Sequence, residues 1–534
     1  MPTSEPRSLS STIRRLLFTQ HAGRDALVSL SLANLCWIKF WDSLLFHSGE
    51  TRYFSLYPDN PADYWAAIVN VFGFSVLFFA ASCWMRRQSS RWVQEVVTCI
   101  FLALLLVPLN LARQALGWDP EMVWRSGLLW PGLAVAGMAL FWRYQLRHIM
   151  TLALIALAPF CIVTISQAAW RGMVGQEPKR TSDSLPDGRI QAAGNSPRVL
   201  WIIFDEWDQD IAFERRPADL KLPNFDAFSK AAIVATNAYP PAGNTTFSIP
   251  SYLIGEYLVN ARPNSNGQMQ VQRAGGSAER LFSESTNILS DLARDGKQVA
   301  VVGWYHPYDR LLTAAPNLRI YWTAAPDTES FRGFHLADAL IAQLRVSLLP
   351  LEVRTQGIES YRRIQAAACR VARDPSVDLA FIHYPIPHWP WIYDRAAQSF
   401  SNGYRAAVDG YLNNLALADR SLGEVMAEIT NSGLQQRTTI IISSDHWWRK
   451  SPLVDGSRNH RIPFMVHLAT DENPFVFEGT TNTVCTAEIV RSLLDGTIRD
   501  REALVARLRA AGHAAELRDN SYFDSAAATA VPVD

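Results

Sequence analysis

The 534-residue sequence has no excess charge of either sign, since 50 Lys and Arg residues balance 50 Asp and Glu residues. A chain without a basic excess gives no indication of a polyanion partner, so we expect no nucleic acid. Cysteine is also scarce. Of six cysteines, only Cys369 and Cys485 lie beyond the apolar first third of the chain, and spacing alone does not establish whether they pair. The sequence has no fixed-period repeat and no low-complexity tract.

Hydrophobic residues crowd into residues 1–172, where five stretches approach the length of a bilayer span. They run at about 26–46, 64–85, 95–113, 127–142 and 149–170. A buried helical bundle is the alternative explanation, but Arg-rich and aromatic connectors are more typical of a membrane protein. The sequence therefore predicts a membrane domain with five transmembrane helices over residues 1–172.

The distribution of arginine sets the expected orientation of these helices. Arginines gather before the first stretch, between the second and third, and between the fourth and fifth: Arg7, Arg14, Arg15, Arg24, Arg86, Arg87, Arg91, Arg143 and Arg147. The positive-inside rule makes these segments cytoplasmic, so the chain after residue 172 is expected on the opposite side of the membrane. The first stretch is long and lacks an obvious small-residue cleavage site, so no cleavable signal peptide is expected.

A polar segment containing Gly and Pro, residues 173–197, is predicted to be a linker. Continuous apolar runs then begin with "RVLWIIFD" at residue 198 and continue with "QVAVVGWY", "VDLAFIHY", "TTIIISSD" and "IPFMVHL". Helical patterns separate them, of which "YLNNLALADRSLGEVMAEI" is the clearest. Apolar strands alternating with helices predict an exported α/β domain over 198–534, with a largely parallel central sheet covered on both faces.

Acidic and imidazole side chains accompany the ends of these predicted strands: Asp205, Glu206, His383, His388, Asp445, His446 and His460. Ligands in open α/β sheets gather beyond the carboxyl ends of the strands. Carboxylates and imidazoles that converge there suit a divalent cation such as zinc or manganese. Each piece alone has a simpler explanation, as a helix cap, a surface pair or a packed loop. The joint pattern favours a metal site.

The stretch "GNTTFSIPSYLIG" (243–255) has two explanations. Thr and Ser ahead of an apolar run commonly cap the first turn of a helix. One threonine can also act as a nucleophile, and the two roles are compatible because a helix N-terminus directs N–H groups towards an anion. The nearby stretch "GWYHPYDRLL" (303–312) has two interpretations. It lines the acceptor side of a site, or His306 packs between a strand and a loop.

Five blocks of the exported domain resemble the alkaline phosphatase superfamily, in the branch of sulfatases, phosphoethanolamine transferases and lipoteichoic acid synthases. "VLWIIFDEW" and "TIIISSDHWW" resemble the two metal-binding strands. "LPNFDAFSKAAIVATNAYPPAGNTTFSIPSYLIG" is similar to the stretch that ends at the nucleophile, "FIHYPIPHWPWIY" to the two-histidine block of the transferases, and "NHRIPFMV" to a late histidine ahead of a proline. The resemblance runs from residue 198 to about 495 and implies an alkaline phosphatase-like fold.

The resemblance implies a nucleophile at Thr245, three residues before Ser248 and five before Pro250, whereas Thr246 is the less favoured choice. It also implies one divalent metal ion, Zn²⁺ or alternatively Mn²⁺. The implied ligands are Asp205 or Glu206, Thr245, Asp445 and His446. Spacing to Asp210 favours Asp205 of the acidic pair, while the glutamate of the transferases favours Glu206.

Three further histidines match those that hold phosphate or a weaker second metal in the family, namely His383, His388 and His460. His388 or His460 is also expected to carry the proton of the leaving or accepting oxygen. The sequence departs from the family at Trp447, where glycine is common, which narrows the expected site. The cysteines that flank the nucleophile in many phosphoethanolamine transferases are absent, and the Asp-x-x-x-His pair of two-metal phosphodiesterases is missing, which favours one tight metal.

The resemblance implies a multi-pass enzyme of the bacterial inner membrane with a periplasmic or extracellular catalytic domain. Its expected reaction moves phosphoethanolamine or phosphoglycerol from a phospholipid to an envelope glycan or lipid through a phospho-threonine. Threonine argues against a sulfatase, whose nucleophile is a Cys or Ser converted to formylglycine. Two alternatives stay open: a metal-dependent phosphodiesterase or phosphonate hydrolase of the same superfamily, and a non-catalytic envelope-assembly protein.

Overall fold

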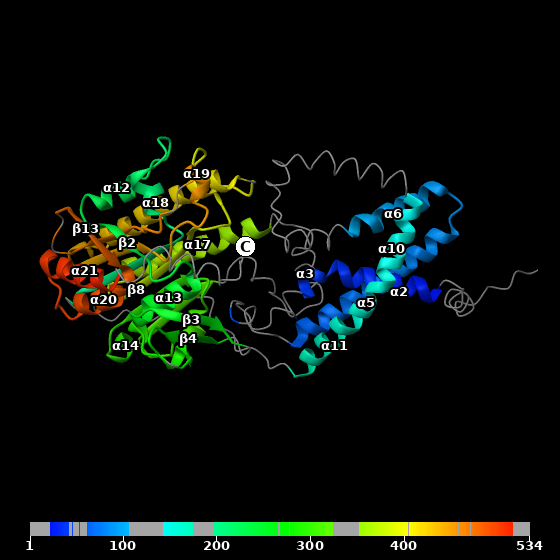
Figure 1. Ribbon diagram of the computed structural model, residues 1–534, viewed down its shortest axis with the longest axis horizontal. Helices are drawn as coiled ribbons and strands as arrows, with labels where there is room; N and C mark the ends of the chain where they lie inside the picture. The colour runs from blue at the N-terminus through cyan, green and yellow to red at the C-terminus, as the bar shows by residue number, and fades with distance from the viewer. Residues whose placement is uncertain are drawn as a thin grey trace, which may run out of the picture.

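The structure is a computed structural model, and it describes most of the chain. The described residues are 22–41, 45, 53, 61–105, 143–174, 196–264, 268–276, 278–323, 352–403, 405–456, 459–469, 471 and 473–515. They form a group of N-terminal helices and, from residue 196 onward, an α/β domain (Figure 1).

The α/β domain is built on an eight-stranded sheet with the order β13-β2-β12-β11-β1-β8-β6-β7. Its strands are β1 (Arg198–Asp205), β2 (Ile233–Tyr239), β6 (Val299–Trp304), β7 (Leu318–Thr323), β8 (Leu379–Pro387), β11 (Thr438–Ser444), β12 (Phe464–His467) and β13 (Phe475–Asn482). All neighbouring pairs are parallel except those that β12 makes with β11 and β2. This confirms the predicted α/β domain with a largely parallel sheet.

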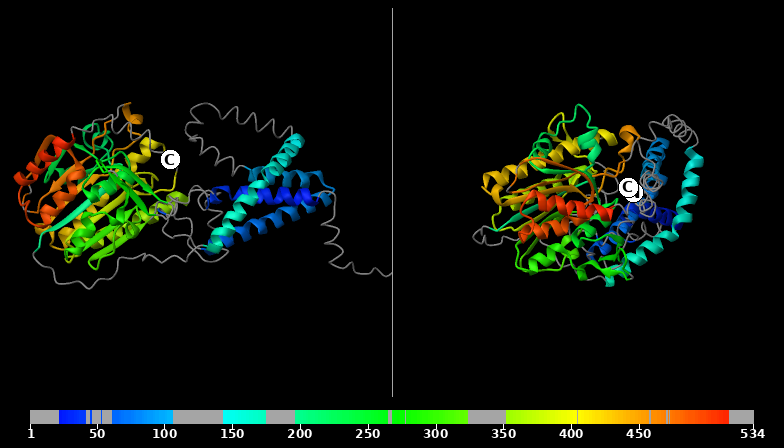
Figure 2. Two further views of the ribbon diagram at one scale, coloured as in Figure 1. Left: turned by 60° about the horizontal axis from the view of Figure 1, so that its bottom comes forward. Right: turned by 60° about the vertical axis from the view of Figure 1, so that its left-hand side comes forward.

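Alternate side chains of the central strand feed two separate hydrophobic cores. Trp201 and Ile203 of β1 enter one core, while Ile202 and Phe204 enter the other. The first core is covered by α13 (Thr245–Ile254), α14 (Ile288–Arg294), α20 (Thr486–Leu494), α21 (Arg501–Ala515) and a small sheet of β3 (Leu258–Pro263), β4 (Met269–Arg273) and β5 (Arg280–Leu281). The second is covered by α12 (Pro223–Ser229), α17 (Glu352–Arg373) and α18 (Ala407–Asn431), on the opposite face of the sheet (Figures 1 and 2).

Short elements complete the domain: η2 (Asp210–Glu214), η3 (Phe282–Glu284), α15 (Tyr308–Leu311), β9 (Tyr393–Asp394), β10 (Ser399–Phe400), η4 (Gln435–Arg437), α19 (Pro452–Asp455) and η5 (Thr483–Cys485). Both cysteines of this domain are free. Cys485 packs against the first core and Cys369 against the second, so the sheet separates them. The disulfide that the sequence left open is therefore not formed.

The N-terminal region contains α2 (Ala22–Cys36), α3 (Ile38–Trp41), α5 (Pro61–Arg87), α6 (Arg91–Leu104), α10 (Arg143–Leu157) and α11 (Pro159–Val174), which pack side by side (Figure 2). Among the described residues, two helical segments are long and apolar enough to cross a membrane, Tyr64–Arg87 and His148–Val174. They match the second and fifth predicted spans. The fourth, 127–142, lies outside the described residues, as does most of the predicted linker, so the five-helix membrane domain stays a prediction.

Candidate active site

The directions of the strands place the predicted site residues at one edge of the sheet, where its parallel strands have their carboxyl ends. Asp205 ends β1, and Asp445 directly follows β11, its parallel neighbour. β12 runs in the opposite direction, so His460, which precedes it, lies at the same edge. Thr245 enters from the segment that follows β2. Because all these positions lie beyond the same edge, residues far apart in the sequence share one buried site.

Thr245 is the first residue of α13, but it does not cap the helix. The side chain of Asn244 fills that role by accepting a hydrogen bond from the Phe247 amide at 3.1 Å. The helix ends at Gly255, which has a φ of 76° that glycine adopts without strain. Since Asn244 takes over capping, the hydroxyl of Thr245 is available for other partners.

The Thr245 hydroxyl lies among two carboxylates and an imidazole. Its Oγ1 donates to Oδ2 of Asp445 at 2.7 Å and lies 3.4 Å from Oδ2 of Asp205 and 3.4 Å from Nε2 of His446. Oδ1 of Asp445 accepts from the amides of Glu206 and His446 at 3.1 and 2.8 Å, which holds its Oδ2 towards the threonine. The neighbouring Thr246 instead contacts the hydroxyl of Tyr305 at 2.9 Å. The geometry distinguishes the two threonines.

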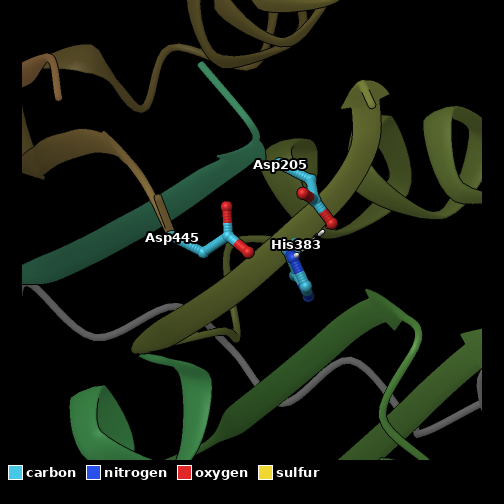
Figure 3. Close-up of side chains that lie close together, drawn as sticks. All are labelled: Asp205, His383 and Asp445. Carbon is cyan, nitrogen blue, oxygen red and sulfur yellow. Dashed lines mark ion pairs between the residues drawn. The ribbon is translucent and has the colours of Figure 1, made fainter. Parts of the chain in front are cut away.

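Asp205, His383 and Asp445 form a buried group whose ligand atoms all lie within 4.8 Å of one another (Figure 3). Nε2 of His383 lies 3.9 Å from Oδ2 of Asp205. Within the described part of the chain, Oδ1 of Asp205 and Nε2 of His383 have no hydrogen-bond partner. Buried polar atoms normally have partners, so two such atoms, on side chains whose ligand atoms lie within 4.8 Å of one another, fit a cation that both side chains would bind.

The pKa values of these groups shift in the directions that burial causes. Burial, with the nearby charges of Asp445 and Glu206, holds the pKa of Asp205 well above its usual value. Burial also lowers the pKa of His446, and burial together with neighbouring imidazoles holds the pKa of His383 well below 6.5. Neutral imidazoles keep a lone pair for a metal. For His446 this is Nε2, because Nδ1 donates to the carbonyl of Trp447 at 2.9 Å.

Glu206 follows Asp205 directly, but among the described residues it does not belong to the group of Asp205, His383 and Asp445. It has a φ of 64°, in the left-handed region that is strained for a residue with a side chain. Its Oε1 pairs with Nε of Arg449 at 3.2 Å. Burial acts to raise its pKa, but His388, Arg449 and His446 together bring the pKa below the usual value. Of the acidic pair, Asp205 is thus the member beside Thr245, and Glu206 anchors Arg449.

The remaining predicted histidines lie around this group. His388 stacks at an angle on Trp304 with ring centroids 5.4 Å apart, and its amide donates to the carbonyl of Asp205 at 3.1 Å. His460 is buried against Trp447, whose ring centroid is 4.2 Å away. Trp447 also packs on Gly243, where an added Cβ would lie 2.7 Å from the indole. The tryptophan that replaces the common glycine therefore packs against the segment that leads to Thr245.

Two residues near the site were not predicted from the sequence. Tyr308 on α15 places its hydroxyl 3.0 Å from Nδ1 of His383, so it orients a candidate ligand. An added Cβ on Gly303 would lie 2.2 Å from the Tyr308 ring, so glycine is required there. Tyr53, from the N-terminal region, contacts His306 at 2.7 Å. The stretch "GWYHPYDRLL" contained the signal for Tyr308, whereas nothing local pointed to Tyr53.

Residues 366–496 match the sulfatase family model. Over this region the chain is similar to sulfatases. This region contains His383, His388, Asp445, His446 and His460, while Asp205 and Thr245 lie ahead of it. An ulvan-active sulfatase from Formosa agariphila is 21% identical over 325 residues, which cover 55% of this chain and 58% of that protein. The chain thus spans somewhat more than half the length of this curated relative.

Solved structures of the alkaline phosphatase superfamily are also similar to this chain. The phosphonate monoester hydrolase of Agrobacterium radiobacter is 16% identical and has a TM-score of 0.38, with 59% of this chain and 77% of that chain covered. The PsFucS1 sulfatase from Pseudoalteromonas sp. is 14% identical with a TM-score of 0.39, covering 58% of this chain and 72% of that one. A superfamily protein from Vibrio parahaemolyticus is 13% identical, with a TM-score of 0.36 and coverage of 57% and 67%.

Proposed function

We propose that this protein is a metal-dependent transferase that moves a phospho-alcohol group, phosphoethanolamine or phosphoglycerol, from a phospholipid to an envelope glycan or lipid. The reaction passes through a phospho-threonine at Thr245. The observation that carries this proposal is the position of Oγ1, 2.7 Å from Asp445, 3.4 Å from Asp205 and 3.4 Å from His446. A structural threonine at the start of a helix has no need of three ionisable partners.

The residues present fit a divalent cation, Zn²⁺ or Mn²⁺. Asp205, Thr245, Asp445 and His446 would hold it, with His383 as a fifth donor in place of the predicted Glu206. When bound, such an ion favours the alkoxide of a coordinated hydroxyl and neutralises charge that builds up on phosphorus. Two observations support this assignment: burial favours the neutral form of His446 and His383, and Oδ1 of Asp205 has no hydrogen-bond partner in the described part of the chain.

The protein groups then account for each bond and proton. Thr245 Oγ1 attacks phosphorus and passes its proton to Oδ2 of Asp445, towards which the hydroxyl already points. The bond from phosphorus to the lipid oxygen breaks, and that oxygen takes a proton from His388 or His460. In the second step an acceptor hydroxyl gives its proton to the same histidine and attacks phosphorus, while the bond to Thr245 breaks and Oγ1 takes back the proton held by Asp445, which restores both groups. The positive N-terminus of α13 favours the phosphoryl group beside Thr245 in both steps.

The N-terminal helices support a lipid donor. Large apolar side chains are exposed along α5 and α11, including Val76 (65%), Leu77 (62%), Ile162 (70%) and Trp170 (64%). Exposed apolar surface of this extent is typical of a membrane or protein interface. A catalytic domain tethered to a bilayer meets phospholipid headgroups at high effective concentration. Threonine at the nucleophile position, rather than Cys or Ser, disfavours sulfate ester hydrolysis.

The test is the intact mass of the full-length, metal-loaded protein after incubation with phosphatidylethanolamine or phosphatidylglycerol vesicles. We expect an added mass equal to one phospho-alcohol group, absent in Thr245→Ala and present in the matched control Thr246→Val. Release of free phospho-alcohol into water without any acceptor would favour the hydrolase alternative. A metal-loaded protein that yields neither an adduct nor a product would contradict the proposal.

A further inference from the structure

Tyr53 is a residue of the N-terminal region that is buried in the core of the catalytic domain. It lies between α3 and α5 in the sequence, yet it is 0% exposed and belongs to the same hydrophobic core as Trp201, Ile249 and Tyr308. Its ring meets the His306 imidazole edge to face, with centroids 5.8 Å apart. The contact joins residues 253 positions apart in the chain.

The hydrogen bonds around His306 fix the direction of this contact. Nε2 of His306 lies 3.1 Å from the backbone carbonyl of Thr245, which can only accept, so Nε2 carries the hydrogen. In a neutral imidazole Nδ1 is then an acceptor, and the Tyr53 hydroxyl, 2.7 Å away, must donate to it. Tyr53 therefore selects the tautomer in which His306 donates to the nucleophile residue.

We propose that Tyr53 is a positioning residue for Thr245, acting through His306, so that the N-terminal region completes the active site of the catalytic domain. This inference rests on the proposed function for its kinetic consequence. The Thr245 carbonyl belongs to the first turn of α13, and a donor on it fixes the peptide plane from which the side chain projects. Displacement of a reacting atom by less than about 1 Å is enough to slow an enzymatic step.

The position of Tyr53 also has a topological consequence. Residue 53 lies between the first and second predicted spans, and its contact is with the domain that follows the last span. A side-chain contact cannot pass through a bilayer, so Tyr53 and the catalytic domain belong on one side of the membrane. The arginine distribution predicts the same arrangement, from different residues.

The test compares Tyr53→Phe with Tyr361→Phe in the full-length, metal-loaded protein. Tyr361 is the matched control, because it loses one buried hydroxyl, bonded to Ser421 at 2.8 Å, in the other core. Hydrogen exchange measured by mass spectrometry should be faster in the Tyr53→Phe variant for the peptide containing Asn244 to Ser248, and unchanged there in Tyr361→Phe. Equal exchange of that peptide in wild type and Tyr53→Phe would overturn the inference, whatever the activity.

Kinetics with bis(4-nitrophenyl) phosphate give the second measurement. We expect kcat to fall roughly fivefold to tenfold in Tyr53→Phe while KM changes less than twofold, the effect of losing one oriented hydrogen bond. In a His306→Gln background, which lacks the Nδ1 acceptor, Tyr53→Phe should add no further loss. If the two substitutions instead lower kcat independently, so that their fold-changes multiply, Tyr53 does not act on Thr245 through His306. The wild-type protein could be inactive on this ester and on lipid while Tyr53→Phe still speeds hydrogen exchange in the Asn244 to Ser248 peptide. That result would contradict the proposed function but not the positioning role of Tyr53.

Discussion

A charged side chain is buried at each end of β1, but the two side chains differ in how fully their polar atoms are hydrogen-bonded. At the amino end, Arg198 is 0% exposed and all three guanidinium nitrogens have partners: the carbonyls of Val377 and Val371 and the hydroxyl of Thr438. At the carboxyl end, Asp205 is also 0% exposed, but its Oδ1 has no hydrogen-bond partner among the described residues and other acidic side chains adjoin it.

This difference separates a structural charge from a proposed metal ligand on a single strand. A buried cation with a full set of acceptors stabilises the fold, and its pKa, lowered by burial to about 10, leaves it charged at neutral pH. A buried carboxylate with a missing partner and raised pKa destabilises the fold unless a cation is supplied. We infer that stability is concentrated at the amino edge of the sheet and reactivity at the carboxyl edge.

The largest expected effect is on activity at the carboxyl edge. Replacing Thr245 by Ala should lower turnover roughly 10³-fold or more, because the residue proposed to bond to phosphorus is removed. Thr245→Ser keeps a hydroxyl and should retain measurable activity. Unfolding monitored by tryptophan fluorescence should show little change in either variant. Full activity of the alanine variant would show that Thr245 is not the nucleophile.

The next effect is on stability at the amino edge. Arg198→Met should lower the free energy of unfolding by about 3 kcal/mol, since three acceptors lose their donor in the interior. The matched control is Arg420→Met, an arginine whose side chain is 50% exposed and paired with Glu424, where we expect a change within about 0.5 kcal/mol. Chemical unfolding of both variants provides the measurement. The turnover of folded Arg198→Met should match wild type, and a selective loss of kcat would contradict the division between the two edges.

The sequence predicted the strands that place the site because they are continuous apolar runs buried on both faces. β1, β11 and α18 lie where these patterns indicated. β7 at one edge of the sheet was missed, and so were β2 and β13 near the other edge, because part-buried or exposed residues interrupt the hydrophobic pattern of each strand. β2 pairs with β12 and with β13, and these contacts join distant segments that no local pattern specifies.

The placement of the candidate site residues was predictable where acidic or imidazole side chains follow the strand ends, as at Asp205, Asp445 and His446. The sequence could not predict that Asn244 rather than Thr245 caps α13, because both residue types are favoured at the N-cap of a helix. The separation of Asp205 from Glu206 depends on a backbone turn at Glu206 and on Arg449, which is 243 positions away. The contact of Tyr53 with His306 could not be predicted for the same reason, because the two residues are 253 positions apart and meet only in the folded chain.

A third prediction uses the pH dependence of the free energy of unfolding to test whether the His306 imidazole is buried in its neutral form. Burial lowers the pKa of His306 from 6.5 to about 4, so below pH 6.5 the unfolded chain binds a proton that the folded state does not. Stability attributable to this group is fully present above 6.5 and is lost as pH falls towards 4, at about 1.4 kcal/mol per pH unit. Unfolding experiments between these limits should give a shallower slope for His306→Gln than for wild type. Equal slopes would show that His306 is not held neutral.

The smallest expected effect compares the same substitution at two buried carboxylates. In metal-free protein, Asp205→Asn should raise the free energy of unfolding by about 1 kcal/mol, because it removes a buried charge that neighbouring acids repel. Asp419→Asn should lower it by about the same amount, since Asp419 accepts from the Phe225 amide at 2.7 Å and from Asn224 at 2.9 Å. Adding Zn²⁺ should then stabilise wild type and Asp419→Asn but not Asp205→Asn. If both variants lose stability without metal, the carboxyl end of β1 is as well satisfied as the amino end, and the two edges do not differ as described.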